Sequence, residues 1–211
     1  MKNNFTITRQ SIDVLNNIIT KMENKSFHNH YHIIYDICDS FNHDVTYLEI
    51  GAYAGGSASL ASSHKNVKHV FSIDIGKPIT KEIPIRNVNN FKHKNCSYHY
   101  FEGSSHDSNI INDVHKNVKA VDILFIDGDH SYDAVLKDFN NFKDLVKSGG
   151  YIIFDDYLDA KHSPKVRGAV DFIVQNLNND EFEILGSLSY PELKFTNWDS
   201  VSSNEFIIRK K

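Results

Sequence analysis

The chain has 211 residues, of which 23 are Lys or Arg and 27 are Asp or Glu, so its formal charge is −4. This mildly acidic balance disfavours a nucleic-acid-binding protein, because such modules carry a clear basic excess. The longest apolar runs fall far short of the roughly 20 residues that span a bilayer, and the two cysteines are too few for a disulfide framework or a paired-cysteine zinc motif. We therefore expect one large cytoplasmic domain, or one domain with an appendage, without nucleic-acid or membrane partners.

The first 43 residues are expected to be largely helical. Apolar residues recur at helical spacing in two stretches, Ile12–Met22 and Ile33–Phe41, and the polar stretch Glu23–His32 separates them. We interpret residues 1–43 as a helical segment that caps the substrate site and residues 44–211 as the ligand-binding domain.

From Val45 onward, short apolar runs alternate with helical stretches, of which the helix expected over Tyr132–Val146 is the clearest. This alternation predicts βαβ units in a largely parallel α/β sheet, which binds ligands at the carboxyl ends of its strands. Trp198, between the last two strands, is expected to pack in the core. The expected strands are Thr46–Ile50, His69–Asp74, Ser97–Glu102, Val121–Asp127, Tyr151–Asp155, Phe182–Gly186 and Glu205–Arg209.

A glycine loop follows the first expected strand, in the sequence EIGAYAGGS that begins at Glu49. A Walker A loop requires a lysine that this segment lacks, and a dinucleotide fingerprint requires a glycine where Tyr53 stands. An acidic residue before the turn, with Gly51 and Gly55 after it, suits a ligand with a cationic amine-bearing group, such as S-adenosylmethionine. Asp74, which ends the second strand, can accept hydrogen bonds from ribose hydroxyls, and the turn Glu102–Ser105 lies where an adenine edge is expected.

Acidic residues end the next two strands. Asp127 ends the fourth strand, and Asp155 and Asp156 end the fifth. If these strands pair, they lie ~4.8 Å apart, and the three carboxylates repel one another unless they share a cation. Oxygen ligands favour Mg²⁺, with Mn²⁺ or Ca²⁺ as alternatives. His130, with an unperturbed pKa of ~6.5, is a candidate general base beside a metal that acidifies a bound hydroxyl.

Together these segments resemble the class I S-adenosylmethionine-dependent methyltransferases. More narrowly, they resemble the metal-dependent O-methyltransferases of the group that includes macrocin O-methyltransferase and cephalosporin hydroxylase-like proteins. The most specific part is the sequence IDGDHSY beginning at Ile126, with the later pair Asp155–Asp156, and the resemblance spans roughly Val45–Arg209. It implies a Rossmann-like seven-stranded sheet in the order 3-2-1-4-5-7-6, with the last strand antiparallel and helices on both faces.

The resemblance also implies roles for individual residues. His130 and Asp127 are the expected catalytic residues, with His130 as the general base, and Asp127, Asp155 and Asp156 are the expected metal ligands. The expected contacts to S-adenosylmethionine are Glu49, Gly51, Ala52, Tyr53, Gly55, Ser57, Asp74, Glu102, Gly103, Ser104, Ser105 and Asp127.

These residues predict methyl transfer to a hydroxyl of a small molecule. A sugar, whether a nucleotide-sugar, a glycan or a glycoside, is the expected acceptor, because the resembled group modifies such hydroxyls. A catechol or another phenol is the alternative acceptor. A non-catalytic protein that binds S-adenosylmethionine is a further alternative, and an oxidoreductase is a third class that the residue pattern does not favour. The resemblance also makes a homodimer a reasonable expectation.

Overall fold

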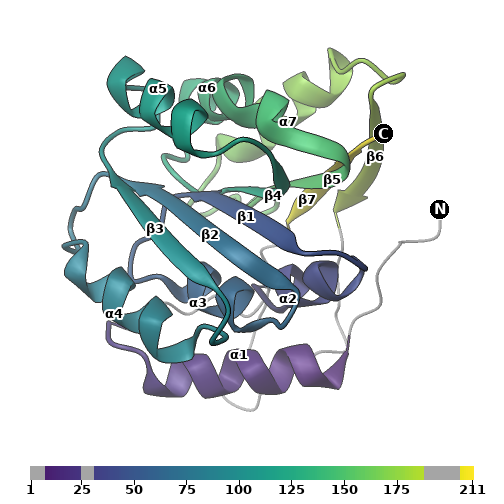
Figure 1. Ribbon diagram of the computed structural model, residues 1–211. Coiled ribbons are helices and arrows are strands. Elements are labelled where there is room, and N and C mark those ends of the chain that lie inside the picture. The colour runs from purple at the N-terminus through teal and green to yellow at the C-terminus, as the bar shows by residue number, and fades with distance from the viewer. Residues whose placement is uncertain (1–7, 25–30, 188–204) are drawn as a thin grey trace.

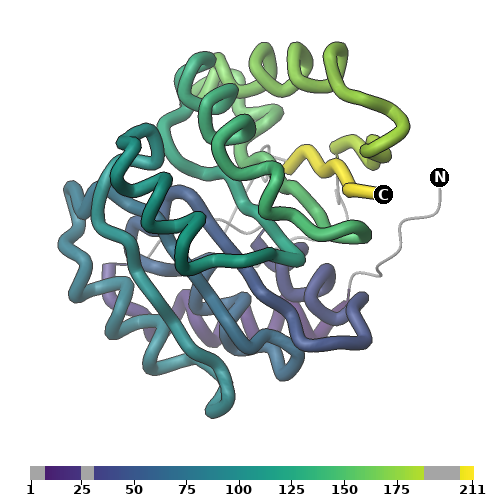
Figure 2. The backbone as a smooth tube through the Cα atoms, turned by 45° about the horizontal axis from the view of Figure 1, so that its top comes forward, coloured from purple at the N-terminus to yellow at the C-terminus, as the bar shows by residue number. Residues whose placement is uncertain are grey.

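The computed structural model describes residues 8–24, 31–187 and 205–211. It has three layers, with a seven-stranded sheet between two layers of helices (Figure 1). The strand order is β3-β2-β1-β4-β5-β7-β6, and β7 runs antiparallel to both of its neighbours. Figure 2 shows the C-terminal strand, in yellow, against the green part of the chain. The predicted fold class, strand order and antiparallel last strand are confirmed.

Six of the strands begin within two residues of the starts expected from the sequence, whereas β5 begins five residues before the expected Tyr151. The four pairings among β3, β2, β1, β4 and β5 are all parallel, so these strands present their carboxyl ends at the same edge of the sheet. The strands are β1 (Val45–Ile50), β2 (Val67–Asp74), β3 (Ser97–Glu102), β4 (Val121–Ile126), β5 (Val146–Phe154), β6 (Phe182–Ser187) and β7 (Phe206–Lys210).

Helices α1 to α4 cover one face of the sheet, and α5 to α7 cover the other (Figure 1). Across the described ranges, no helix combines the length and the apolar character that crossing a membrane requires. The helices are α1 (Arg9–Lys21), α2 (His32–Asp39), α3 (Gly56–Ser63), α4 (Glu82–Phe91), α5 (Ser108–Asn117), α6 (Tyr132–Phe142) and α7 (Val166–Gln175).

The predicted helix over Tyr132–Val146 is wrong at its C-terminal end. Helix α6 ends at Phe142, a short 3-10 turn covers Lys143–Leu145, and β5 begins at Val146. The first part of β5 is irregular, because the pairing with β4 shifts register after Val121 and Gly149 has a φ of +83°. Val146 is buried at the irregular start of β5. Its apolar side chain therefore fits the helical pattern of the sequence, although the residue belongs to a strand.

The N-terminal helices share a core with the sheet. Leu15 and Ile18 of α1 and Ile34 of α2 belong to the same buried cluster as Tyr47 of β1. Helix α1 begins at a capping residue, since the Thr8 side chain accepts a hydrogen bond from the Ser11 backbone N–H. The division of the chain after residue 43 and a capping role for residues 1–43 stay predictions. Trp198 lies outside the described residues.

A buried carboxylate joins three neighbouring strands at the edge opposite the strand carboxyl ends. Asp122, near the start of β4, is 1% exposed. Its Oδ2 accepts hydrogen bonds from the Thr46 backbone N–H of β1 at 2.8 Å and from Lys147 Nζ of β5 at 2.9 Å. Its Oδ1 lies 2.8 Å from His43 Nε2. Asp122 therefore fixes the relative positions of β1, β4 and β5.

We predict that Asp122→Ala lowers the free energy of unfolding by about 2 kcal/mol, because it removes the buried carboxylate that accepts hydrogen bonds from β1 and β5. Urea denaturation measures this change. The matched control is Asp144→Ala, which removes an exposed carboxylate beside Lys143 and should cost less than about 1 kcal/mol. Equal losses in the two variants would contradict the bracing role of Asp122.

Candidate active site

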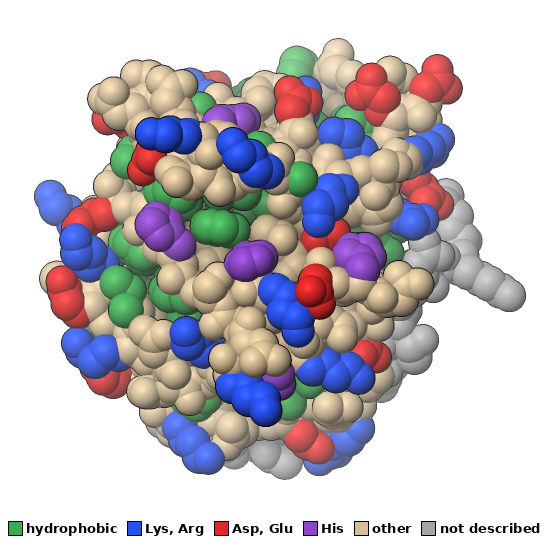
Figure 3. All heavy atoms as spheres, viewed as in Figure 1, with side chains coloured by type: hydrophobic (Ala, Val, Ile, Leu, Met, Phe, Trp, Pro, Cys, Tyr) green, Lys and Arg blue, Asp and Glu red, His purple; other side chains and the backbone are tan. Residues whose placement is uncertain are grey.

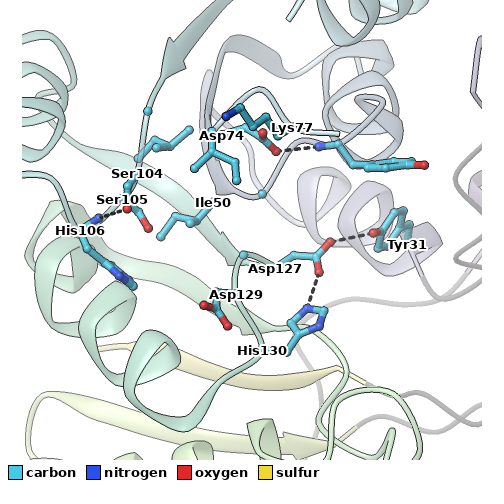
Figure 4. A pocket seen from close by; sticks show the side chains of 16 residues that line it. Tyr31, Ile50, Asp74, Lys77, Ser104, Ser105, His106, Asp127, Asp129 and His130 are labelled. Atoms are coloured by element: carbon cyan, nitrogen blue, oxygen red, sulfur yellow. Dashed lines mark hydrogen bonds and ion pairs between the residues drawn. The ribbon is translucent and has the colours of Figure 1, made fainter. Parts of the chain in front are cut away.

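A cavity of about 760 Å³ opens at the carboxyl ends of β1 to β4. This is the edge at which parallel α/β sheets bind their ligands. Figure 4 shows Ser104, Ser105 and His106 at one end of the cavity and Tyr31 and His130 at the other. The structure thus brings the predicted turn after the third strand and the predicted general base into one pocket.

The glycine loop after β1 depends on close backbone contacts. Gly51 has a φ of +89°, and a Cβ atom at this position would lie 1.9 Å from the carbonyl oxygen of Asp127. The Gly51 N–H donates to the Ile73 carbonyl, and the Asp127 N–H donates to the Ile50 carbonyl, each at 2.9 Å. Only glycine combines this φ with this clearance, so Gly51 sets the spacing between the loops after β1 and β4.

Asp74 lines the pocket and also shapes the glycine loop. Its Oδ2 accepts hydrogen bonds from the backbone N–H groups of Ala52 at 2.8 Å and Tyr53 at 2.9 Å. Its Oδ1 accepts a hydrogen bond from the Gly76 N–H at 2.7 Å. The carboxylate at the end of β2 is therefore held in place by backbone N–H groups of the loops after β1 and β2.

Glu49 lies in the protein interior and is not part of the pocket lining. Its Oε2 accepts hydrogen bonds from Ser57 Oγ at 2.6 Å and Tyr47 OH at 3.1 Å, and its Oε1 accepts one from Ser72 Oγ at 2.7 Å. Burial raises the pKa of Glu49 to about 7 against the lowering effect of these donors. In the structure, Glu49 is therefore bonded to Ser57 of α3. Its predicted contact with a ligand stays a prediction.

The other predicted cofactor residues divide into two groups. Those that line the pocket are Gly51, Tyr53, Asp74, Gly103, Ser104, Ser105 and Asp127. Ala52, Gly55, Ser57 and Glu102 lie outside the lining, as Glu49 does. Ser57 donates to Glu49, and Glu102 pairs with Lys81 Nζ at 2.7 Å.

Asp127 is the centre of a polar cluster at the second end of the pocket. Its Oδ2 accepts a hydrogen bond from Tyr31 OH at 2.8 Å, and its Oδ1 lies 3.2 Å from His130 Nε2 (Figure 4). Burial and the neighbouring Asp155 raise the pKa of Asp127 well above its usual value. Burial, with Asp127 and Asp155 nearby, also raises the pKa of Tyr31, so this hydroxyl keeps its proton.

Ser163 connects His130 to Asp156. Ser163 Oγ donates to Asp156 Oδ2 at 2.7 Å and lies 3.0 Å from His130 Nδ1. Asp156 is buried and has a φ of +55°, a left-handed conformation that aspartate tolerates better than most residues. The loop after β5 therefore brings a serine hydroxyl against the ring nitrogen that faces away from Asp127.

The predicted metal ligands lie at the ends of two paired strands, since Asp127 follows β4 and Asp155 and Asp156 follow β5. Their oxygen chemistry fits a hard divalent cation. Their arrangement does not form a ready cage, because no three His, Cys, Asp or Glu side chains in the described ranges are grouped to hold a metal ion. Asp127 contacts Tyr31 and His130, and its carboxyl group also interacts with that of Asp155.

Several residues of the site were missing from the sequence-based predictions. Among them, Tyr31, Lys77 and His106 line the pocket, and Ser163 contacts His130. His106 directly follows the predicted turn and Lys77 lies three residues after Asp74, so a wider window around each strand end would have included both. Tyr31 and Ser163 carry no local signal, because long-range packing brings them to the site.

A family model described as a methyltransferase domain matches residues 48–157 of this chain. An uncharacterized protein, R132 of Acanthamoeba polyphaga mimivirus, is 36% identical over 175 residues, which is 78% of each chain. The matched range contains the glycine loop, Asp74, Asp127 and the Asp155–Asp156 pair.

Solved structures of methyltransferases share the fold. An O-methyltransferase from Bacillus cereus in complex with S-adenosylhomocysteine has a TM-score of 0.61 and 14% identity, and the match covers 96% of this chain and 91% of that one. An rRNA methylase from Streptococcus thermophilus has a TM-score of 0.62 and 12% identity, with 86% and 96% covered. A putative methyltransferase from Streptococcus mutans, also with S-adenosylhomocysteine, has a TM-score of 0.60 and 12% identity, with 88% and 100% covered. At these identities the likeness shows the fold alone.

The raised pKa of Glu49 predicts a pH-dependent stability. The folded protein retains a proton that the unfolded chain releases between about pH 4.5 and 7. Stability therefore falls as the pH rises through this window, by up to about 3 kcal/mol. We predict that Glu49→Gln, which cannot ionise, removes most of this fall in urea unfolding measured at pH 5 and pH 8.

The control for this measurement is Glu102→Gln, which alters a half-exposed carboxylate at the end of β3. It should retain the fall in stability seen in the unmodified protein. An equal fall in the Glu49→Gln variant would show that Glu49 is ionised across the whole range.

Proposed function

This chain belongs to the methyltransferase-domain family, and from that premise we propose that it transfers the methyl group of S-adenosylmethionine to a hydroxyl oxygen of a sugar. The observation that carries the proposal is the position of Asp127 and His130 at one end of a pocket whose other end is the turn after β3. A cofactor bound along the strand ends places its sulfonium methyl group beside Asp127 and His130.

The orientation of the cofactor follows from the residues along the pocket. Asp74, at the end of β2, receives the ribose hydroxyls, as an acid at this place does in nucleotide-binding α/β sheets. The adenine ring lies toward Ser104 and Ser105, and the sulfonium group lies toward Asp127. The buried carboxylates near that end favour a positively charged ligand.

His130 is the general base in this proposal. If Ser163 Oγ donates to Asp156, the same oxygen accepts the proton of His130 Nδ1. Nε2 of the neutral ring then carries a lone pair, which accepts the proton of the acceptor hydroxyl once that hydroxyl takes the place of Asp127 Oδ1 beside Nε2. The acceptor oxygen forms its bond to the methyl carbon as the carbon–sulfur bond breaks, and S-adenosylhomocysteine leaves with that electron pair. Holding both reactants in line supplies ~7–11 kcal/mol of the barrier reduction.

The proposal includes a bound divalent cation, for which Mg²⁺ is the first choice. Asp127, Asp155 and Asp156 are the residues that hold it, and the mutual repulsion of Asp127 and Asp155 supports a shared positive charge. When bound, the ion lowers the pKa of the acceptor hydroxyl. Asp127 contacts Tyr31 and His130 in the structure, so binding of the cation requires a rearrangement at Asp127.

The polar character of the acceptor end supports a polyhydroxylated acceptor. Tyr31, Asp127 and His130 provide hydrogen-bonding groups there, which suits a sugar better than an apolar ring. On the face seen in Figure 3, basic and acidic side chains are interspersed, which favours a small acceptor over a nucleic acid. A catechol or another phenol remains the alternative acceptor, and a non-catalytic protein that binds the cofactor is the alternative without chemistry.

We predict that the protein, incubated with S-adenosylmethionine, Mg²⁺ and a panel of sugar nucleotides, glycosides and catechols, adds one methyl group to a hydroxyl acceptor. Mass spectrometry detects the product. His130→Ala should reduce turnover by roughly 10²–10⁴-fold, the usual contribution of a general base, and should leave the affinity for S-adenosylhomocysteine unchanged. His115→Ala, on the far end of α5 and outside the pocket lining, is the matched control.

Turnover by His130→Ala at the rate of the control would remove His130 as the base. Binding of S-adenosylhomocysteine without turnover of any acceptor would favour the non-catalytic alternative.

The proposed requirement for a cation leads to a separate prediction. Stringent chelation should abolish turnover, and added Mg²⁺ should restore it, because the ion acidifies the acceptor hydroxyl. Asp155→Asn should raise the Mg²⁺ concentration that gives half-maximal turnover. Unchanged turnover after chelation, with metal content verified by mass spectrometry, would exclude the cation from the reaction.

A further inference from the structure

Tyr31 reaches the acceptor end of the pocket from a part of the chain that the family model does not match. The family model begins at residue 48, whereas Tyr31 lies immediately before α2. Its side chain is 5% exposed. The ring packs edge-on against Phe125 of β4, with centroids 5.6 Å apart and an interplanar angle of 90°. The N-terminal segment thus contributes a well-packed aromatic residue to the pocket wall.

The hydroxyl of Tyr31 is bonded to an oxygen of Asp127, the carboxylate proposed to bind the cation. It is a neutral donor 2.8 Å from Asp127 Oδ2, and the other oxygen of the same carboxylate lies beside His130 Nε2. Figure 4 shows Tyr31 and His130 converging on Asp127 from different sides. The Tyr31 hydroxyl is therefore already hydrogen-bonded to Asp127, the carboxylate beside which the proposed reaction takes place.

We propose that Tyr31 is a specificity-determining residue whose hydroxyl holds Asp127 until a divalent cation and an acceptor hydroxyl take its place. This inference rests on the proposed function. An incoming ligand must replace a hydrogen bond to a carboxylate, so the site selects ligands that bind Asp127 strongly: a hard divalent cation, and with it an acceptor that presents a neutral hydroxyl. A molecule without such a hydroxyl leaves Tyr31 in contact with Asp127.

Tyr35, in α2, provides a matched control. It is 8% exposed, and its hydroxyl accepts a hydrogen bond from Gln10 Nε2 at 3.2 Å. Its ring packs edge-on against His64, away from the pocket lining. Tyr31→Phe and Tyr35→Phe each delete one hydroxyl from a buried aromatic residue and keep the ring, but only the first deletes a donor to Asp127.

The experiment measures Mn²⁺ binding by electron paramagnetic resonance in protein saturated with S-adenosylhomocysteine. Tyr31→Phe should bind Mn²⁺ about tenfold more tightly than the unmodified protein, because the cation no longer displaces the hydrogen bond from Tyr31 to Asp127. Tyr35→Phe should bind Mn²⁺ as the unmodified protein does. For an acceptor found in the panel, Tyr31→Phe should lower the KM several-fold, while kcat changes less than about twofold.

Three results would overturn the proposal. The first is an affinity for Mn²⁺ in Tyr31→Phe that equals or falls below that of the unmodified protein. The second is a tightening of equal size in Tyr35→Phe, which would indicate a general loosening of α2. The third is the absence of Mn²⁺ binding in all variants while S-adenosylhomocysteine still binds. Failure of the unmodified protein to bind S-adenosylhomocysteine at all would instead overturn the proposed function, and this role of Tyr31 with it.

Discussion

The close approach of the backbone at Gly51 and Asp127 is the constraint on which the pocket depends. The loop after β1 and the loop after β4 are in contact because Gly51 has no side chain, and a Cβ atom there would collide with the Asp127 carbonyl. The same peptide segment carries the Asp127 carboxylate, which contacts Tyr31 and His130. A side chain at position 51 would therefore disturb the cofactor loop and the proposed catalytic pair together.

Neutral hydroxyl groups donate hydrogen bonds to the buried carboxylates around this pocket. Three hydroxyls donate to Glu49, Tyr31 donates to Asp127, and Ser163 donates to Asp156. A hydroxyl meets the hydrogen-bonding need of a buried carboxylate but does not cancel its charge. The region beneath the strand ends can therefore attract a proton, a divalent cation or a sulfonium group. A net charge of −4 for the whole chain understates how strongly the acids are concentrated here.

The strands and the strand-end acids were predictable from the sequence because both are local features. Strand β4 is buried along all six of its residues, as a central parallel strand should be, and reads as an uninterrupted apolar run apart from Asp122. Asp74 and Asp127 stand directly at strand ends, so a rule about where parallel sheets bind ligands was enough to place them in the pocket. The end of α6 was not predictable, because the buried Val146 belongs to both the helical pattern and the strand.

The sequence by itself determined the α/β class and the family resemblance, together with the group of acids and the histidine at one edge of the sheet, since a strand and its following loop are continuous in the chain. Only the tertiary structure decided which neighbours these acids have. Glu49 turned out to contact Ser57 and Ser72 in the interior, whereas Asp127 received Tyr31 from 96 positions away. Such pairs depend on how helices and loops pack around the sheet, and packing between distant segments leaves no periodic or local trace in the sequence.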